Sequence, residues 1–191
     1  MSHKFDPKKL AKLNNPERVK LQDPDVMWEK LDCEIQDCLV DIGAGTGFYS
    51  QLFLNKMATG MVYALDISDE MLAWTTENLP GVKAARVQPM KMQESETPLS
   101  DSLADAVVML NLHHELHDPS ALMAECFRIL KPRGKVLISD WKACDGEMGP
   151  PQEIRKSAVQ IQQDLEQAGF RGVQSFESFS QHSLVIAQKP E

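Results

Sequence analysis

A short apolar run that ends in three closely spaced glycines constrains this chain more than any other feature. The apolar run covers residues 39–42, and the glycines are Gly43, Gly45 and Gly47. An acidic residue, Asp41, interrupts the run two positions before the first glycine. The pattern predicts a buried strand that turns into a helix, where a ligand can approach bare backbone and the N–H groups of the helix terminus.

The glycine spacing excludes two common phosphate-binding motifs. The dinucleotide fingerprint G-x-G-x-x-G needs a third glycine at position 48 or 50, where this chain has Phe48 and Ser50. A P-loop needs Gly-Lys-Ser or Gly-Lys-Thr at its end, and neither follows here. What remains is the pattern G-x-G-x-G with an acid just before it.

A second acidic residue ends the next apolar run. Residues 61–66 are typical of a buried strand, and Asp66 lies at its end, about twenty residues after the glycine loop. In nucleotide-binding α/β units, an acid at this place hydrogen-bonds ribose hydroxyls. The alternative role, capping the next helix, suits Ser68 and Asp69 better. Asp66 is therefore the strongest single candidate for a ligand contact.

Strand and helix patterns alternate from residue 37 onward, which predicts an α/β fold with a parallel sheet. Only a short polar turn separates the last two predicted strands, so they should form an antiparallel hairpin. The predicted strands cover residues 37–42, 61–66, 82–87, 104–110, 134–140, 171–177 and 183–188. The predicted helices cover residues 47–57, 69–79, 119–130 and 151–168.

The N-terminal region differs in character from the rest of the chain. Residues 1–35 are polar and contain Pro7, Pro16 and Pro24, each placed to start a short helix. We expect them to form a helical extension that acts as a cap or lid on a domain of residues 36–191. A chain of 191 residues suffices for one domain with a proper core and leaves little for a second.

The glycine loop, with Asp41 before it and Asp66 after it, resembles the first motifs of the class I S-adenosylmethionine-dependent methyltransferases. Residues 98–105 and 130–140 are similar to later segments of that family. The resemblance is to the type 11, quinone-biosynthesis-like branch, which methylates small molecules. It implies a Rossmann-like, seven-stranded, mostly parallel sheet with an antiparallel C-terminal hairpin and helices on both faces. It also implies S-adenosylmethionine as the cofactor and in-line methyl transfer to a small-molecule acceptor.

The resemblance places the cofactor at the carboxyl ends of the strands, where open α/β sheets bind ligands. An acid near the glycine loop would take the ammonium of the methionine end directly or through water, and backbone amides would take its carboxylate. The expected cofactor-binding residues are Asp41, Gly43, Ala44, Gly45, Thr46, Gly47, Asp66, Ile67, Met71, Met92, Gln93, Glu94 and Asn111.

One position departs from the family pattern. Members of the family usually carry an aspartate about five residues before Pro98, where it accepts a hydrogen bond from the adenine amino group, and this chain has Gln93 there. Gln93 can accept through its side-chain carbonyl, or Glu94 can substitute after a small shift of register. Met71 and Met92 are candidate apolar walls for the purine, with core packing as the alternative.

Two adjacent histidines follow the fourth predicted strand. His113 and His114 are the candidate catalytic residues, because an imidazole titrates near neutral pH and can orient or deprotonate an acceptor. In the alternative interpretation, one packs near the cofactor and the other makes supporting hydrogen bonds. No metal is expected, because the H-E-x-H pattern of residues 114–117 lacks the H-E-x-x-H spacing of a helical zinc site.

Composition narrows the range of partners. The net charge of −8 argues against binding to a phosphate backbone as the main role. No apolar run approaches membrane length, the N-terminus lacks a signal-peptide core, and the four cysteines show no CxxC spacing. We therefore expect a cytoplasmic protein with free thiols. Two alternatives to a small-molecule methyltransferase remain. One is a non-catalytic binder of S-adenosylmethionine or S-adenosylhomocysteine, and the less favoured one is a protein or nucleic-acid methyltransferase. The sequence does not indicate the oligomeric state.

Overall fold

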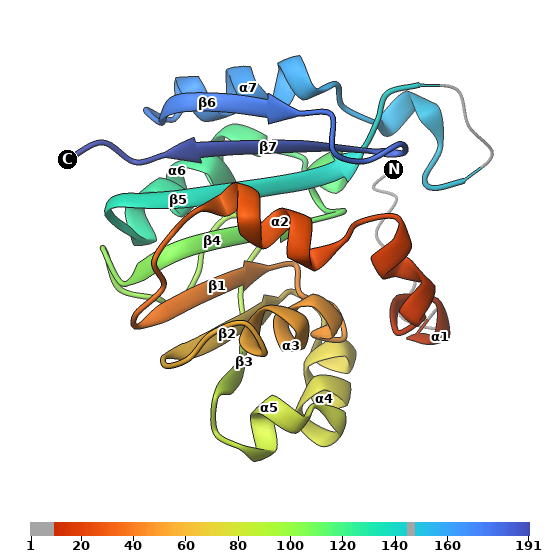
Figure 1. Ribbon diagram of the computed structural model, residues 1–191, viewed down its shortest axis with the longest axis vertical. Helices are drawn as coiled ribbons and strands as arrows, with labels where there is room; N and C mark the ends of the chain where they lie inside the picture. The colour runs from red at the N-terminus through yellow and green to blue at the C-terminus, as the bar shows by residue number, and fades with distance from the viewer. Residues whose placement is uncertain (1–9, 145–147) are drawn as a thin grey trace.

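The computed structural model describes residues 10–144 and 148–191, and a mixed sheet of seven strands runs through its middle (Figure 1). The strands lie in the order β3–β2–β1–β4–β5–β7–β6. β7 runs antiparallel to both of its neighbours, and the other pairs are parallel. The strands are β1 (Cys38–Ile42), β2 (Met61–Asp66), β3 (Val87–Lys91), β4 (Ala104–Leu110), β5 (Leu130–Trp141), β6 (Arg171–Phe176) and β7 (His182–Gln188).

The strand order has a switch point between β1 and β4, where successive strands stop being added on one side and start on the other. Ligands of open α/β sheets bind beyond the carboxyl ends of the strands at such a point. Because β7 is antiparallel, its first residue, His182, pairs with Trp141 at the end of β5 and lies at the same edge. We call this side of the sheet the carboxyl edge.

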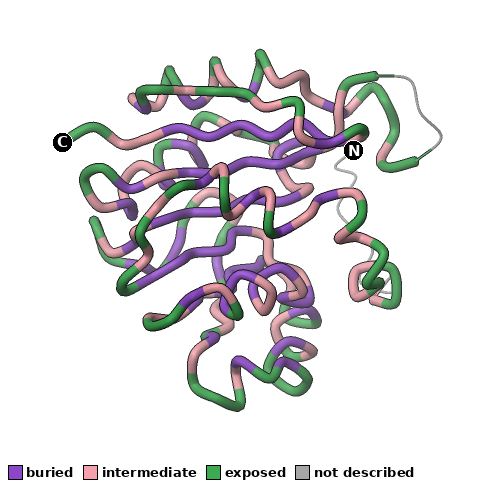
Figure 2. Tube along the Cα trace, in the orientation of Figure 1, coloured by how far each residue is buried: buried purple, intermediate pink, exposed green. Residues whose placement is uncertain are grey.

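Helices cover both faces of the sheet and divide the core in two. α2 (Pro24–Leu31) and α3 (Phe48–Leu54) contribute buried side chains to one face. α6 (Pro119–Ile129) and α7 (Ala158–Gln167) do so on the other. The central strands β1 and β4 are consequently buried along almost their whole length, as Figure 2 shows. The remaining helical segments are α1 (Leu10–Leu13), η2 (Pro16–Lys20), α4 (Asp69–Asn78), α5 (Pro80–Lys83), η3 (His113–Glu115) and η4 (Gln152–Ile154).

The structure confirms the α/β fold, the antiparallel hairpin and most of the predicted elements. The strand predicted at residues 82–87 is wrong, because Pro80–Lys83 forms α5 and the strand begins only at Val87. Pro80 starts this helix, a position where the missing N–H costs nothing, and Val82 packs against the core from it. The helix predicted from residue 151 begins at Ala158, because Ser157 caps it in a capping box with Gln160.

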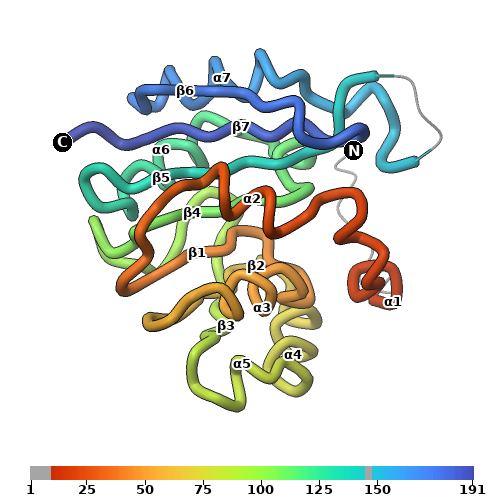
Figure 3. Tube along the Cα trace, in the orientation of Figure 1, coloured from red at the N-terminus to blue at the C-terminus, as the bar shows by residue number. Residues whose placement is uncertain are grey.

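The described part of the N-terminal extension consists of two regions with different surroundings. α2 belongs to the core, where Met27 and Leu31 are fully buried. Residues 10–22 lie instead at the carboxyl edge, as the red segment of Figure 3 shows. There the guanidinium of Arg18 lies 5.3 Å from the ring centre of Phe48 and 4.9 Å from that of Tyr49. Residues 1–9, including Pro7, lie outside the described residues, and the lid role of the extension stays a prediction.

Two simpler observations concern the whole described chain. None of its helices is both long enough and apolar enough to cross a membrane. Cys33, Cys38, Cys126 and Cys144 are free thiols.

Candidate active site

The glycine loop joins the end of β1 to α3 in a left-handed backbone conformation. Gly43, Gly45 and Gly47 have φ angles of 71°, 57° and 69°, which side-chain-bearing residues rarely adopt. The N–H groups of Gly43 and Ala44 donate to the carbonyl of Leu65 at 2.8 and 2.9 Å. The loop is therefore fixed to the end of β2.

Asp66 supports this loop from the end of β2. Its Oδ2 accepts the N–H of Gly45 at 2.7 Å, and its Oδ1 accepts the N–H of Ser68 at 2.8 Å. Burial raises the pKa of Asp66, although these backbone N–H groups stabilise the carboxylate. A carboxylate oxygen can accept more than one hydrogen bond, so the side chain can hold the loop and still receive ligand hydroxyls. The sequence argument found this residue but not its role as a support for Gly45.

Asp41 lies beneath the loop. Its side chain is buried, and its Oδ2 accepts a hydrogen bond from Ser50 Oγ on α3 at 2.6 Å. Burial raises the pKa of Asp41 to about 7, although the Ser50 hydrogen bond acts in the opposite direction. Asp41 thus ties β1 to α3 in this structure, and its predicted contact with the ammonium of the cofactor stays a prediction.

The turn after β4 completes the site on the other side of β1. Asn111 adopts a left-handed φ of 57°, and the side chain of Leu112 lies so close to Gly43 that an added Cβ would be 2.7 Å from Leu112 Cδ2. This contact holds the end of β4 against the glycine loop. Two buried polar atoms here, Asn111 Oδ1 and Thr46 Oγ1, have no hydrogen-bond partner within the described part of the chain.

The residues predicted around the adenine lie in varied surroundings. Met92 is part of the core, and Met71 is also buried. Gln93 is exposed, and its backbone N–H donates to the carbonyl of Glu96 at 3.0 Å. Glu94 Oε1 lies 2.6 Å from Nδ1 of His117, and Ile67 is 40% exposed. Of the two candidate acceptors, Gln93 therefore has the more open side chain.

The two histidines of η3 have different partners. His114 Nδ1 lies 2.7 Å from Asp140 Oδ1, and the backbone N–H of His114 donates to Asp140 Oδ2 at 2.9 Å. Burial lowers the pKa of His114, but the hydrogen bond and charge of Asp140 and the charge of Glu115 outweigh burial, so that the net shift is upward. The pair resembles the oriented histidines of acid–base catalysis, in which a carboxylate fixes one ring nitrogen and leaves the other for the reaction.

His113 points into the packing between η3 and α7. It is fully buried, and its Nε2 lies 3.0 Å from Asp164 Oδ2 of α7 without the alignment of a hydrogen bond. Burial lowers the pKa of His113, although the nearby charges of Asp140 and Asp164 act in the opposite direction. A neutral, enclosed imidazole suits packing better than proton transfer.

Comparison with known proteins identifies this arrangement. The sequence profile of the "Methyltransferase domain" family matches residues 40–138, more than half of the chain. The solved structure of a SAM-dependent methyltransferase from Aquifex aeolicus is 32% identical to this chain. The superposition covers 97% of this chain and 99% of the Aquifex aeolicus chain, with a TM-score of 0.90. The chain belongs to the S-adenosylmethionine-dependent methyltransferases.

Curated relatives of this methyltransferase differ in their acceptors. The malonyl-[acyl-carrier protein] O-methyltransferase of Methylococcus capsulatus is 27% identical over 121 residues, which are 56% of this chain and 43% of the relative. The ubiquinone/menaquinone biosynthesis C-methyltransferase of Chromobacterium violaceum is 32% identical over 108 residues, 55% of this chain and 43% of the relative. The methyltransferase thus spans less than half the length of these two proteins.

The residues at the carboxyl edge of the methyltransferase fit S-adenosylmethionine. Asn111 Oδ1 and Thr46 Oγ1 are buried polar atoms without partners among the described residues, and buried polar groups require one. At Gly45 an added Cβ would meet only Leu13 Cδ1, at 3.4 Å, so backbone is open to a ligand there. Asp66 supplies a carboxylate beside that backbone.

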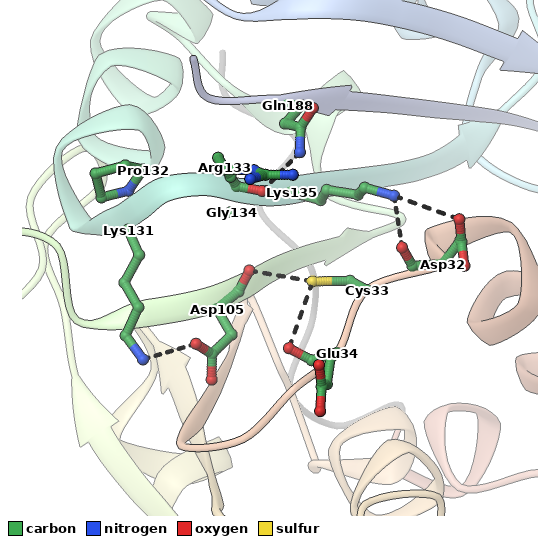
Figure 4. Close-up of a pocket in the computed structure, with 10 residues that line it drawn as sticks. All are labelled: Asp32, Cys33, Glu34, Asp105, Lys131, Pro132, Arg133, Gly134, Lys135 and Gln188. Atoms are coloured by element: carbon green, nitrogen blue, oxygen red, sulfur yellow. Dashed lines mark hydrogen bonds and ion pairs between the residues drawn. The ribbon is translucent and has the colours of Figure 1, made fainter. Parts of the chain in front are cut away.

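A cavity at the opposite end of the methyltransferase sheet serves the fold. It has a volume of about 420 Å³ and lies where the parallel strands begin (Figure 4). Lys131 Nζ lies 2.6 Å from Asp105 Oδ1, and Asp105 Oδ2 accepts the N–H groups of Asp37 and Cys38 at 2.8 and 2.9 Å. These bonds fasten the start of β1 to β4 and β5, away from the edge where ligands of such sheets bind.

Sequence reasoning missed three polar residues at the carboxyl edge. Asp140 gives a signal that was available, because it is an acid at the end of an apolar strand, as Asp41 and Asp66 are. Gln22 gives none, and Ser139 lies in a predicted strand without any feature that marks it as a site residue. Both are buried in the folded methyltransferase and hydrogen-bonded to each other.

Proposed function

We propose that this methyltransferase acts on a small-molecule acceptor that binds over the carboxyl ends of β4 and β5 and loses a proton to His114. The observation that carries the proposal is the His114–Asp140 pair, three residues after Asn111 at the end of β4. Bound S-adenosylmethionine would supply an electrophilic methyl group. The glycine loop, Asp66 and Asn111 would hold the cofactor, and His114 would prepare the acceptor.

The pair of His114 and Asp140 favours acceptors that must lose a proton. Asp140 holds Nδ1 of His114 at 2.7 Å, so Nε2, which lies 3.7 Å from Glu115 Oε1, is the nitrogen that would take the proton of the acceptor. Hydroxyl, activated carbon and amine acceptors need such a base, whereas a carboxylate acceptor does not. Among the relatives, the quinone-biosynthesis protein is named as a C-methyltransferase, which is consistent with this requirement.

The acceptor class is tested with methyl-labelled S-adenosylmethionine and a panel of phenols, β-dicarbonyl compounds, amines and carboxylates, followed by a metabolite extract. We expect protein-dependent labelling of a compound in one of the first three classes. Labelling of carboxylates only would contradict the role of His114. Cofactor binding without transfer to any acceptor would instead support the non-catalytic alternative.

The role of His114 is tested by replacing it with alanine. Removing a general base typically costs a factor of 10² to 10⁴, so we expect His114→Ala to reduce kcat by about 100-fold or more while leaving S-adenosylhomocysteine binding in place. His117→Ala is a matched control, because His117 also pairs with a carboxylate, at 2.6 Å, but is exposed. Equal rates in the His114 and His117 variants would show that His114 only packs.

The pH profile gives a second, independent readout. A protonated His114 cannot accept a proton, so kcat should fall as the pH drops through the pKa of His114, which lies above the ordinary value of about 6.5. Asp140→Asn removes the charge that raises this pKa. The acidic limb of its residual activity should therefore move to lower pH, and an unmoved limb would mean that another group titrates.

A further inference from the structure

A chain of three polar side chains, two of them buried and one partly buried, connects the N-terminal extension to the cofactor side of the carboxyl edge. Gln22 lies between η2 and α2 and is 2% exposed. Its Nε2 donates to Ser139 Oγ on β5 at 2.8 Å. Its Oε1 accepts a hydrogen bond from Asn111 Nδ2 at 2.7 Å. One glutamine thus joins three segments that are far apart in the sequence.

The surroundings of Gln22 determine which way its amide points. The backbone carbonyl of Ser139 lies 3.5 Å from Gln22 Nε2, and a carbonyl oxygen would repel the amide oxygen in that place. Nε2 therefore faces Ser139, and Oε1 faces Asn111. The backbone carbonyl of Gln22 is also held, because Tyr49 Oη of α3 donates to it at 3.1 Å.

The orientation of Gln22 in turn determines that of Asn111. An amide oxygen can receive only a donor, so Asn111 must direct Nδ2 toward Gln22 and Oδ1 away from it. Asn111 Oδ1 is buried and has no partner among the residues that the structure describes. A buried acceptor without a donor is costly, so this atom is available to a donor from a ligand.

The position of Asn111 indicates which donor of the cofactor it would receive. Asn111 follows β4, and its neighbour Leu112 lies against Gly43 of the glycine loop. Asp66, the candidate for the ribose hydroxyls, ends β2 on the other side of β1. The nucleoside part of the cofactor then extends toward β2, and the methionine part remains near β4. The donor in the methionine part is its ammonium group.

We propose that Gln22 and Ser139 are positioning residues that hold the Asn111 amide so that its Oδ1 receives the ammonium of the cofactor's methionine end. The proposal rests on the cofactor site proposed above. It makes the N-terminal extension part of cofactor recognition, because Gln22 reaches Asn111 only when residues 10–22 lie along the carboxyl edge.

The test compares three ligands that differ only at the amino-acid end. S-adenosylhomocysteine has the amino group and the carboxylate, its decarboxylated analogue keeps the amino group, and 5′-methylthioadenosine lacks both. Dissociation constants are measured by calorimetry for the wild type and for Gln22→Leu. Loss of one hydrogen bond to a charged group raises the dissociation constant by at least about tenfold. We expect that loss for both ligands with an amino group, and a change of less than about twofold for 5′-methylthioadenosine.

Two further variants separate positioning from folding. Gln51→Leu is the control, because Gln51 Oε1 also accepts a partly buried hydrogen bond, from the N–H of Gly81, away from the site. If Gln22→Leu does not fold, Ser139→Ala removes the hydrogen bond that holds Gln22 from the other end. It should also weaken the two ligands with an amino group and leave 5′-methylthioadenosine unchanged.

Each outcome decides between specific alternatives. An equal loss for all three ligands, or no change for any, would overturn the positioning role of Gln22 and leave the cofactor site intact. A loss confined to S-adenosylhomocysteine would assign the effect to the carboxylate and also overturn it. A wild-type protein that binds none of the three would instead overturn the cofactor site itself.

Discussion

The two halves of the carboxyl edge are built in opposite ways. On the β1–β2 half, the hydrogen bonds that form the site join residues close together in the sequence. Asp41 and Ser50 are 9 residues apart, and Gly45 and Asp66 are 21 residues apart. On the β4–β5 half, Asn111 to Gln22 spans 89 residues, and Gln22 to Ser139 spans 117. The first half is a local motif that one strand–loop–helix–strand unit can form. The hydrogen bonds of Gln22 in the second half exist only when the N-terminal extension lies against the sheet.

The strongest test of the local half is Asp66→Ala. The substitution removes the acceptor of two backbone N–H groups as well as the proposed ribose contact. Hydrogen bonds to charged groups contribute about 1.5–3 kcal/mol each, so the affinity for S-adenosylhomocysteine measured by calorimetry should fall by at least about 100-fold. Asp69→Asn is the control, since the Asp69 side chain is exposed. Unchanged affinity in Asp66→Ala would refute the ribose assignment.

A second test concerns the pH dependence of stability in the same half. The pKa of Asp41 is about 7 in the folded protein and about 3.9 in an unfolded chain. Between these values the folded state binds the proton more tightly, so this residue makes the free energy of unfolding fall as the pH rises from about 4 to about 7. Asp41→Asn should remove that part of the fall, as measured by urea denaturation without cofactor at several pH values. The same slope in both proteins would show that Asp41 does not titrate there.

The smallest expected effect concerns the adenine end. Gln93 is exposed, and a single hydrogen bond between neutral groups contributes about 0.5–1.5 kcal/mol. Gln93→Ala should therefore weaken S-adenosylhomocysteine by about 2- to 10-fold. It should weaken the binding of 5′-methylthioadenosine equally, because both ligands carry adenine. Gln22→Leu, in contrast, should weaken only S-adenosylhomocysteine of these two. If neither ligand is affected, Glu94 becomes the better candidate for the adenine contact.

The elements that sequence patterns predicted well share strong local signals. β1 and β4 are mostly apolar runs with one aspartate each, and α4 and α6 begin at side-chain caps, Ser68 and Asp118. The failure at β3 has a physical cause. This strand lies at the edge of the sheet, is only partly buried and contains Pro89, so it lacks the apolar pattern of an inner strand.

The two histidines of the candidate site also show where prediction from sequence patterns fails. The adjacent residues His113 and His114 look alike in the sequence, and neither reveals its partner. The fold directs His113 toward Asp164 of α7 and His114 toward Asp140 of β5. Only this difference in partners makes His114 the better candidate for proton transfer.

The sequence by itself determined the fold class and, through the family resemblance, the cofactor. It also predicted the glycine loop and Asp66 of the β1–β2 half, because backbone conformation and neighbouring strands set those features locally. The tertiary structure alone decided which side chains meet at the β4–β5 half. Asn111 was expected at the site, but Gln22 and Ser139 were not, and the amide orientations of Gln22 and Asn111 depend on one another. They become a site only when folding buries them together and each hydrogen bond restricts the next.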